Sequence, residues 1–167
     1  LDRMVSYPHV HIGFADAGAH LRNMAFYNFP LHLLKRVKDA EDAGKGFMTM
    51  ERAVHKLTGE LGEWFELDAG ILEVGARADI AIVDPDALDD ELYGYHEAPI
   101  HEMGGFSRMV RRNDKALTTA IVGGQVAFES GCFAADFGRQ RYGRFLRAGT
   151  KDRAPVEKVH RALAATA

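Results

Sequence analysis

Residues 70–85 read GILEVGARADIAIVDP, and this stretch decides the fold because the apolar pattern changes its period here. Gly70, Gly75 and the Asp84-Pro85 pair punctuate it, and its last apolar run, Ile80 to Val83, is rich in β-branched residues. Short β-branched runs bounded by turn residues are typical of strands. The pattern predicts that β-structure begins at this point and that the carboxyl half of the chain is β-rich.

A hairpin is predicted further along the chain. Leu117 to Val122 and Gln125 to Phe128 flank a Gly123-Gly124 pair, and glycine accepts the positive φ of a tight hairpin turn. The intervening residues, Leu88 to Arg112, carry proline and glycine without a steady period, so we expect a loop that covers a surface. Residues 151–167 are expected to form a solvent-facing helical tail.

The amino half shows helical periods instead. Between Tyr27 and Ala40, apolar residues recur at helical spacing and a proline stands in the first turn, which predicts a helix. A second helix is predicted from Thr49 to Leu57, with Thr49 as its N-cap and Gly59 as its end. A shorter helical turn is expected from Leu61 to Phe65.

The overall composition narrows the class of protein. The 167 residues are 47% hydrophobic, enough for a buried core, and 21 basic against 24 acidic residues give a net charge of −3. No basic face stands out, so neither nucleic acid nor an anionic membrane is expected as a partner. The single cysteine, Cys132, cannot form an intramolecular disulfide, and we find no secretory signal and no apolar run long enough to cross a bilayer. These features predict a cytoplasmic protein.

Residues 10–20 read VHIGFADAGAH and hold the first candidate for a functional site. Alternating apolar residues predict a strand from Val10 to Ala15, and Asp16 follows it directly. A carboxylate in this place can act as a general acid and base, or it can cap the following loop through backbone amides. Spacing alone leaves both alternatives open.

The histidines beside this aspartate raise a second question. His9 and His11 stand two residues apart, so on a strand their side chains would share a face, as metal ligands do. One interpretation is an autonomous zinc site made of His9, His11, Asp16 and His20. The favoured interpretation is that His9 and His11 are solvated or hydrogen-bonded around a turn that precedes the strand.

Four stretches of the chain carry a family resemblance. Residues 14–20, FADAGAH, resemble the S-D-A-G-A-H segment that ends the last barrel strand in N-acyl-D-amino-acid deacylases, the D-aminoacylases of the amidohydrolase superfamily. Residues 70–85 resemble the G-x-L-x-x-G-x-x-A-D-I-x-x-x-D-P signature with which many amidohydrolases re-enter their small β-sandwich domain. Residues 119–126 resemble the hairpin near the family's carboxyl end, and 143–147, GRFLR, resemble its G-R-x-L-R close. Order and spacing fit from Tyr7 to Arg147.

This resemblance implies an α/β fold that is the carboxyl-terminal piece of a metal-dependent (β/α)8 hydrolase. Residues 1–66 would supply the last strand and helices of an incomplete barrel, 67–150 the β-rich part of the composite sandwich domain, and 151–167 a tail. A complete barrel takes about 250 residues, so the resemblance implies that the remainder of the barrel, with the family's metal-binding H-x-H, precedes Leu1. That remainder is then an expected partner of this chain.

The resemblance also implies a chemistry. Asp16 would act as general base and then general acid on a metal-bound water, and would be able to touch the metal together with ligands outside this chain. His20 and Gly18 are the candidate substrate-binding residues. The implied cofactor is Zn²⁺ or another divalent metal in the full-length enzyme, and the implied substrate is a linear amide, an N-acyl-D-amino acid.

Two expectations limit this assignment. The isolated chain is expected to bind no stoichiometric zinc and to show no deacylase turnover, because the family's other metal ligands are absent from it. The alternative from a different class is a non-catalytic structural or oligomerisation module with an amidohydrolase-derived fold. In that case Asp16 only stabilises a loop, and the partner is a second copy of the chain.

Overall fold

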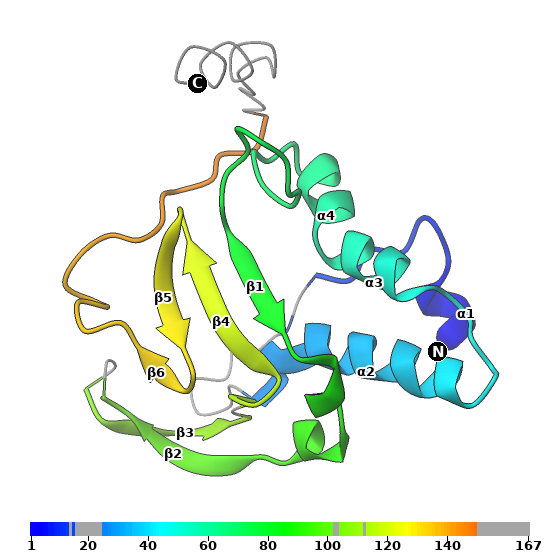
Figure 1. Cartoon of the computed structure of the whole chain (residues 1–167), viewed down its shortest axis with the longest axis horizontal. Coiled ribbons are helices and arrows are strands. Elements are labelled where there is room, and N and C mark those ends of the chain that lie inside the picture. Colours follow the sequence, from blue (N-terminus) through cyan, green and yellow to red (C-terminus); the bar gives the residue numbers. More distant parts are fainter. Residues whose placement is uncertain (14, 16–24, 102–103, 112, 150–167) are drawn as a thin grey trace, which may run out of the picture.

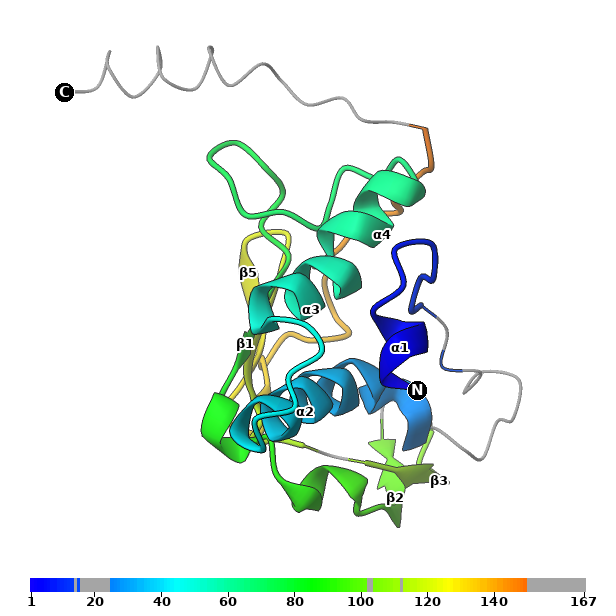
Figure 2. The same ribbon diagram turned by 90° about the vertical axis from the view of Figure 1, so that its right-hand side faces the viewer.

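A layer of helices covers one face of an antiparallel sheet in the computed structural model (Figure 1, Figure 2). The structure describes residues 1–13, 15, 25–101, 104–111 and 113–149. Its α-helices are α1 (Asp2–Val5), α2 (Phe29–Asp42), α3 (Met50–Leu57) and α4 (Gly59–Trp64), and its 3-10 turns are η1 (Ala25–Asn28), η2 (Pro85–Ala87) and η3 (Asp90–Tyr93). Its strands are β1 (Ile80–Val83), β2 (His96–Ile100), β3 (Phe106–Val110), β4 (Leu117–Val122), β5 (Gln125–Glu129) and β6 (Cys132–Phe133).

The predicted helices are present close to their expected bounds. Helix α2 follows the η1 turn directly and carries Pro30 in its first turn, where a missing N–H costs nothing. Helix α3 begins after Thr49, whose hydroxyl accepts a hydrogen bond from the Arg52 backbone N–H at 3.2 Å. The short turn expected near Leu61 is α4. These predictions are confirmed. They were possible because the signals for each helix are local in the sequence.

The predicted role of Gly59 was wrong. The break between α3 and α4 falls at Thr58, and Gly59 begins the next helix. A Cβ built on Gly59 would lie 2.8 Å from the His55 side chain and 3.4 Å from the Gly70 carbonyl oxygen. Gly59 therefore packs closely against His55 and the Gly70 backbone, and it does not act as a helix terminator.

The strand expected from Val10 to Ala15 is not found. Residues 10–13 and 15 adopt no regular secondary structure, and Phe14 lies outside the described residues. A strand is stable only beside a hydrogen-bonded partner, and both sheets of the described residues are built from residues 80 onward. No described segment therefore pairs with this stretch, although its apolar alternation is typical of a strand.

The four-stranded sheet has the order β1-β4-β5-β6, and its strands are antiparallel. The Gly123-Gly124 hairpin is confirmed, and both glycines have positive φ, 59° and 82°. Asp79 ties this turn to the start of β1, because its carboxylate accepts a hydrogen bond from the Gly123 N–H at 2.7 Å. Burial opposes a low pKa for Asp79, but hydrogen bonds from Arg77 and Gly123 outweigh it and hold that pKa below its usual value.

The loop expected between Leu88 and Arg112 was also a wrong prediction. Strands β2 and β3 pair antiparallel within it, with His96 opposite Val110 and Pro99 opposite Ser107. Proline is tolerated in a strand whose N–H faces no partner, and in a two-stranded sheet each strand has one open edge. The two strands follow one another with only residues 101–105 between them, but neither shows a steady alternation of its own, so the sequence pattern did not reveal them.

The hydrophobic core joins residues from both halves of the chain. It lies where α2 and α3 meet η3, and Val37, Ala53 and Leu92 are almost completely inaccessible to solvent. Val5, Leu33, Leu34, Leu88 and Ala116 complete the buried cluster. The predicted division into 1–66 and 67–150 is not tested by this packing and stays a prediction. Among the described helices, none combines the length and apolar character needed to cross a membrane.

Candidate functional site

The three residues predicted to form the site, Asp16, Gly18 and His20, lie outside the described residues. Their roles therefore stay predictions. The structure does describe the chain on both sides of them. We call residues 7–13 the amino flank and residues 25–32 the carboxyl flank, and each is held by its own set of polar contacts.

The histidines of the amino flank have separate partners. His9 is exposed, and its ring meets the Tyr7 ring edge-on with centroids 5.8 Å apart. The His11 ring stacks on the Trp64 ring, with centroids 4.6 Å apart and an interplanar angle of 20°. In the part of the chain that the structure describes, no three His, Cys, Asp or Glu side chains gather as a metal site would require. The zinc site that also includes Asp16 and His20 is not tested.

A buried ion-pair network fastens the amino flank to α3 and α4. Lys56 is fully buried, and its Nζ donates to Glu60 Oε1 at 3.0 Å and to the Tyr7 carbonyl oxygen at 3.3 Å. Arg52 Nη2 donates to Glu60 Oε2 at 2.5 Å. His11 Nδ1 lies 3.2 Å from Glu60 Oε1, but without hydrogen-bond geometry. The network therefore positions the backbone that leads toward Asp16.

The Glu60 carboxylate is the centre of this network. Burial would raise its pKa, but the hydrogen bonds from Lys56 and Arg52 and their charges outweigh burial and lower that pKa. A carboxylate whose pKa is lowered on folding stabilises the fold above the unfolded-state pKa, about 4.3 for Glu. That stabilisation is lost as the pH falls through the lower folded-state pKa.

We predict that Glu60→Gln lowers the free energy of unfolding by about 2 kcal/mol at pH 7, because Lys56 keeps a buried charge without its carboxylate partner. The deficit should shrink as the pH falls below the unfolded-state pKa of Glu, about 4.3, and on through the lower folded-state pKa of Glu60. Urea unfolding across this pH range measures both effects. Glu63→Gln, on the exposed side of α4, is the control. A deficit that does not depend on pH would contradict the assigned role of the charge.

The carboxyl flank is anchored through Asn28. This buried side chain donates from Nδ2 to the Leu92 carbonyl oxygen at 2.9 Å and to Asn113 Oδ1 at 2.8 Å. It thereby joins the start of α2 to η3 and to the residues before β4. The chain is thus anchored on both sides of the segment that contains Asp16. Lys56 and Glu60 hold the backbone before it, and Asn28 holds the backbone after it.

His32 and Arg111 meet one turn further along α2. His32 Nε2 lies 3.2 Å from the Leu92 carbonyl oxygen and 3.1 Å from Arg111 Nη1. Burial lowers the pKa of His32, the contact with the Leu92 carbonyl opposes this, and the Arg111 charge adds to the lowering. The imidazole is therefore neutral at pH 7. A neutral Nε2 serves only one of its two neighbours.

Aromatic rings surround the Arg111 guanidinium. Its Cζ lies 5.5 Å from the Tyr95 ring centroid and 6.0 Å from that of Phe26, within the range of cation–π attraction. We call Phe26, His32, Tyr95 and Arg111 the arginine cluster. Sequence reasoning missed it, because His32 and Arg111 stand 79 residues apart and neither belongs to a motif.

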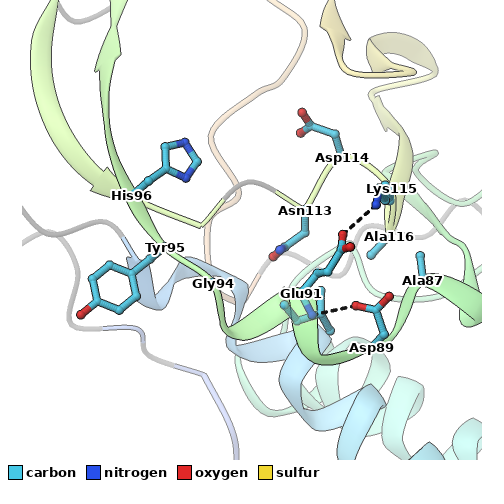
Figure 3. Close-up of a pocket in the computed structure, with 11 residues that line it drawn as sticks. Ala87, Asp89, Glu91, Gly94, Tyr95, His96, Asn113, Asp114, Lys115 and Ala116 are labelled. Atoms are coloured by element: carbon cyan, nitrogen blue, oxygen red, sulfur yellow. Dashed lines mark hydrogen bonds and ion pairs between the residues drawn. The ribbon is translucent and has the colours of Figure 1, made fainter.

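A polar pocket adjoins the arginine cluster (Figure 3). It encloses about 540 Å³ between the η3–β2 region and the residues that precede β4. Two of its carboxylates have hydrogen-bond donors within the pocket. Lys115 Nζ donates to the Glu91 carboxylate at 2.8 Å, and the Glu91 backbone N–H donates to the Asp89 carboxylate at 2.8 Å. The lining residues are Ala87, Asp89, Glu91, Leu92, Gly94, Tyr95, His96, Asn113, Asp114, Lys115 and Ala116. Tyr95 and Asn113 connect this pocket to the arginine cluster and to Asn28.

The chain has close relatives in mycobacteria. "Uncharacterized protein Rv2913c" from Mycobacterium tuberculosis (strain ATCC 25618 / H37Rv) is 53% identical over 155 residues, which are 89% of this chain and 25% of the relative. "Uncharacterized protein Mb2937c" from Mycobacterium bovis (strain ATCC BAA-935 / AF2122/97) matches with the same identity and coverage. The chain thus spans about 25% of the length of these relatives. No protein-family model and no solved structure matches it.

Proposed function

We propose that this chain is the carboxyl-terminal portion of a metal-dependent amidohydrolase that hydrolyses a linear amide, an N-acyl-D-amino acid. The observation that carries the proposal is the resemblance of residues 14–20 and 70–85 to deacylase segments, in the family's order. The strand at Ile80–Val83 and the Gly123-Gly124 hairpin agree with the predicted start of the sandwich domain. The matched region is 25% of the relatives' length, which leaves room for a barrel of about 250 residues.

The metal of this proposal requires ligands beyond the described residues. No suitable group of His, Cys, Asp or Glu side chains lies within the described ranges, so Asp16 and the rest of the full-length protein would have to hold the ion. When bound, a divalent metal lowers the pKa of a coordinated water to about 7 and polarises the amide carbonyl.

Asp16 is the residue of this chain that moves the proton. In the proposed reaction its carboxylate takes a proton from the attacking water as the new C–O bond forms at the amide carbon. It then gives that proton to the nitrogen as the C–N bond breaks, which yields a carboxylic acid and a free amino acid. His20 and Gly18 would contact the substrate beside it, and the two anchored flanks would hold the ends of this segment.

The proposal is tested by assaying the full-length protein for amine release from N-acetyl-D-methionine, with N-acetyl-L-methionine as the matched control. We expect release from the D-enantiomer, loss of release after chelation, and recovery on adding Zn²⁺. Full activity after the metal has been removed, or no release from any N-acyl amino acid by metal-loaded protein, would contradict the proposal.

A further inference from the structure

We infer that the arginine cluster binds the carboxylate of a small N-acyl amino acid, with Arg111 as the residue that recognises it. This inference rests on the proposed function for the identity of the ligand, whereas the site itself is defined by the contacts of Arg111. It adds a substrate-binding residue that lies far from the Asp16 segment in sequence.

Arg111 carries a permanent positive charge. A guanidinium remains protonated at any physiological pH, and this one is partly buried between aromatic rings. Its described contacts are His32, Phe26 and Tyr95, and these include no carboxylate. Some other described arginines do have acidic partners: Arg36 pairs with Asp2 and Arg144 pairs with Asp68. A partly desolvated cation that has no acidic partner among the described residues favours binding of an anion.

Not all N–H groups of Arg111 have an acceptor among the described residues. Because His32 is neutral, its Nε2 either donates to the Leu92 carbonyl oxygen or accepts from Arg111 Nη1. When Nε2 donates to the Leu92 carbonyl oxygen, it has no lone pair left to accept a hydrogen bond, so Arg111 Nη1 has no acceptor at His32. Arg111 Nε is buried without a hydrogen-bond partner among the described residues. The guanidinium therefore has N–H groups available, and a carboxylate can accept two of them in parallel.

The arginine cluster lies between the end of the Asp16 segment and the polar pocket. Phe26 stands directly after Ala25, where the described chain resumes beyond Asp16. Tyr95 also lines the polar pocket, and its ring points away from the pocket's acidic side chains Asp89, Glu91 and Asp114 (Figure 3).

Asn28 offers a hydrogen-bond acceptor for the amide of the ligand. Asn28 Oδ1 is buried and has no hydrogen-bond partner among the described residues, while Asn28 Nδ2 and His32 Nε2 both approach the Leu92 carbonyl oxygen. Asn28 is linked to Arg111 through the Leu92 carbonyl oxygen and His32. A free acceptor on Asn28 suits a ligand that carries an amide N–H next to a carboxylate. An N-acyl amino acid has that arrangement.

The test measures binding to the full-length protein after metal has been removed, so that no turnover takes place. The two probes are N-acetyl-D-methionine and its primary amide, which lacks the carboxylate, and calorimetry gives Kd for each. We expect the wild type to bind the carboxylate about tenfold or more tightly than the amide. Arg111→Gln should lose this preference while its affinity for the amide stays unchanged. Arg111→Lys, which keeps the charge without the planar fork, should keep part of the preference.

Arg108→Gln is the matched control, since Arg108 belongs to the same strand region and its guanidinium lies over Phe106. It should leave both Kd values unchanged. Equal affinity of the wild type for the two probes would overturn the inference, as would a full carboxylate preference in Arg111→Gln. If Arg111→Gln fails to fold, an undiminished preference in Arg111→Lys overturns it and a partial loss supports it. A carboxylate preference in a protein without hydrolytic activity supports this site and contradicts the proposed reaction.

Discussion

Asp16→Asn in the full-length protein is expected to lower the turnover number roughly 1,000-fold, with no change in the thermal unfolding temperature. Asparagine keeps the shape of the side chain and its ability to accept a hydrogen bond, but it cannot take a proton from water or return one to the leaving amine. The measurement is steady-state amine release together with calorimetric unfolding of the same samples. Asp86→Asn is the matched control, because Asp86 is an exposed aspartate within the η2 turn.

This experiment also separates the two classes of function. A non-catalytic module would use Asp16 to cap a loop, and replacing a cap typically lowers stability by about 1 kcal/mol. Loss of stability without a selective loss of turnover would therefore contradict the catalytic role. Turnover of Asp16→Asn equal to that of the wild type would contradict it as well.

Gly70→Ala is expected to have the largest effect on stability, a loss of about 3 kcal/mol or more. Gly70 has a φ of 95°, and a Cβ there would lie 2.6 Å from the Thr58 carbonyl oxygen. Both the backbone conformation and the contact with another backbone segment resist a side chain. Gly62, in α4, packs just as closely, because a Cβ built on it would lie 2.3 Å from the Ala69 carbonyl oxygen. These glycines let α4 lie against the start of residues 70–85.

Urea unfolding of the 167-residue chain measures this loss. The control is Gly46→Ala, where a Cβ would meet no atom within 4 Å and the backbone is not in the left-handed region. We expect that change to stay within about 0.5 kcal/mol of the wild type. A Gly70→Ala chain as stable as Gly46→Ala would show that the packing between α4 and residues 70–85 is not as described.

The helices and the hairpin were predictable because their signals are local. The proline in the first turn of α2 and the Thr49 cap of α3 act within one turn of the helix that they start. The Gly123-Gly124 turn likewise sets the register of its own strands. Strands β2 and β3 were missed because each is stabilised by the other, and neither shows a clear alternation of its own.

The polar groups of the flanks could not be found by the same reasoning. Lys56 belongs to an amphipathic helix, where a lysine is ordinarily solvent-exposed, yet it is fully buried. Its burial depends on Glu60 one turn later and on the Tyr7 carbonyl 49 residues earlier. The contact between His32 and Arg111 likewise depends on the tertiary fold. Such pairs appear only when the packing of the whole chain is known.

We propose that the full-length protein hydrolyses an amide, with Asp16 taking a proton from the water that attacks the amide carbonyl. The most direct test is mass spectrometry of the products formed from N-acetyl-D-methionine in ¹⁸O-labelled water. Hydrolysis predicts one solvent oxygen in the released acetate and none in the released methionine. Acetate that forms without the label, or the absence of any acetate from metal-loaded protein, would contradict the account.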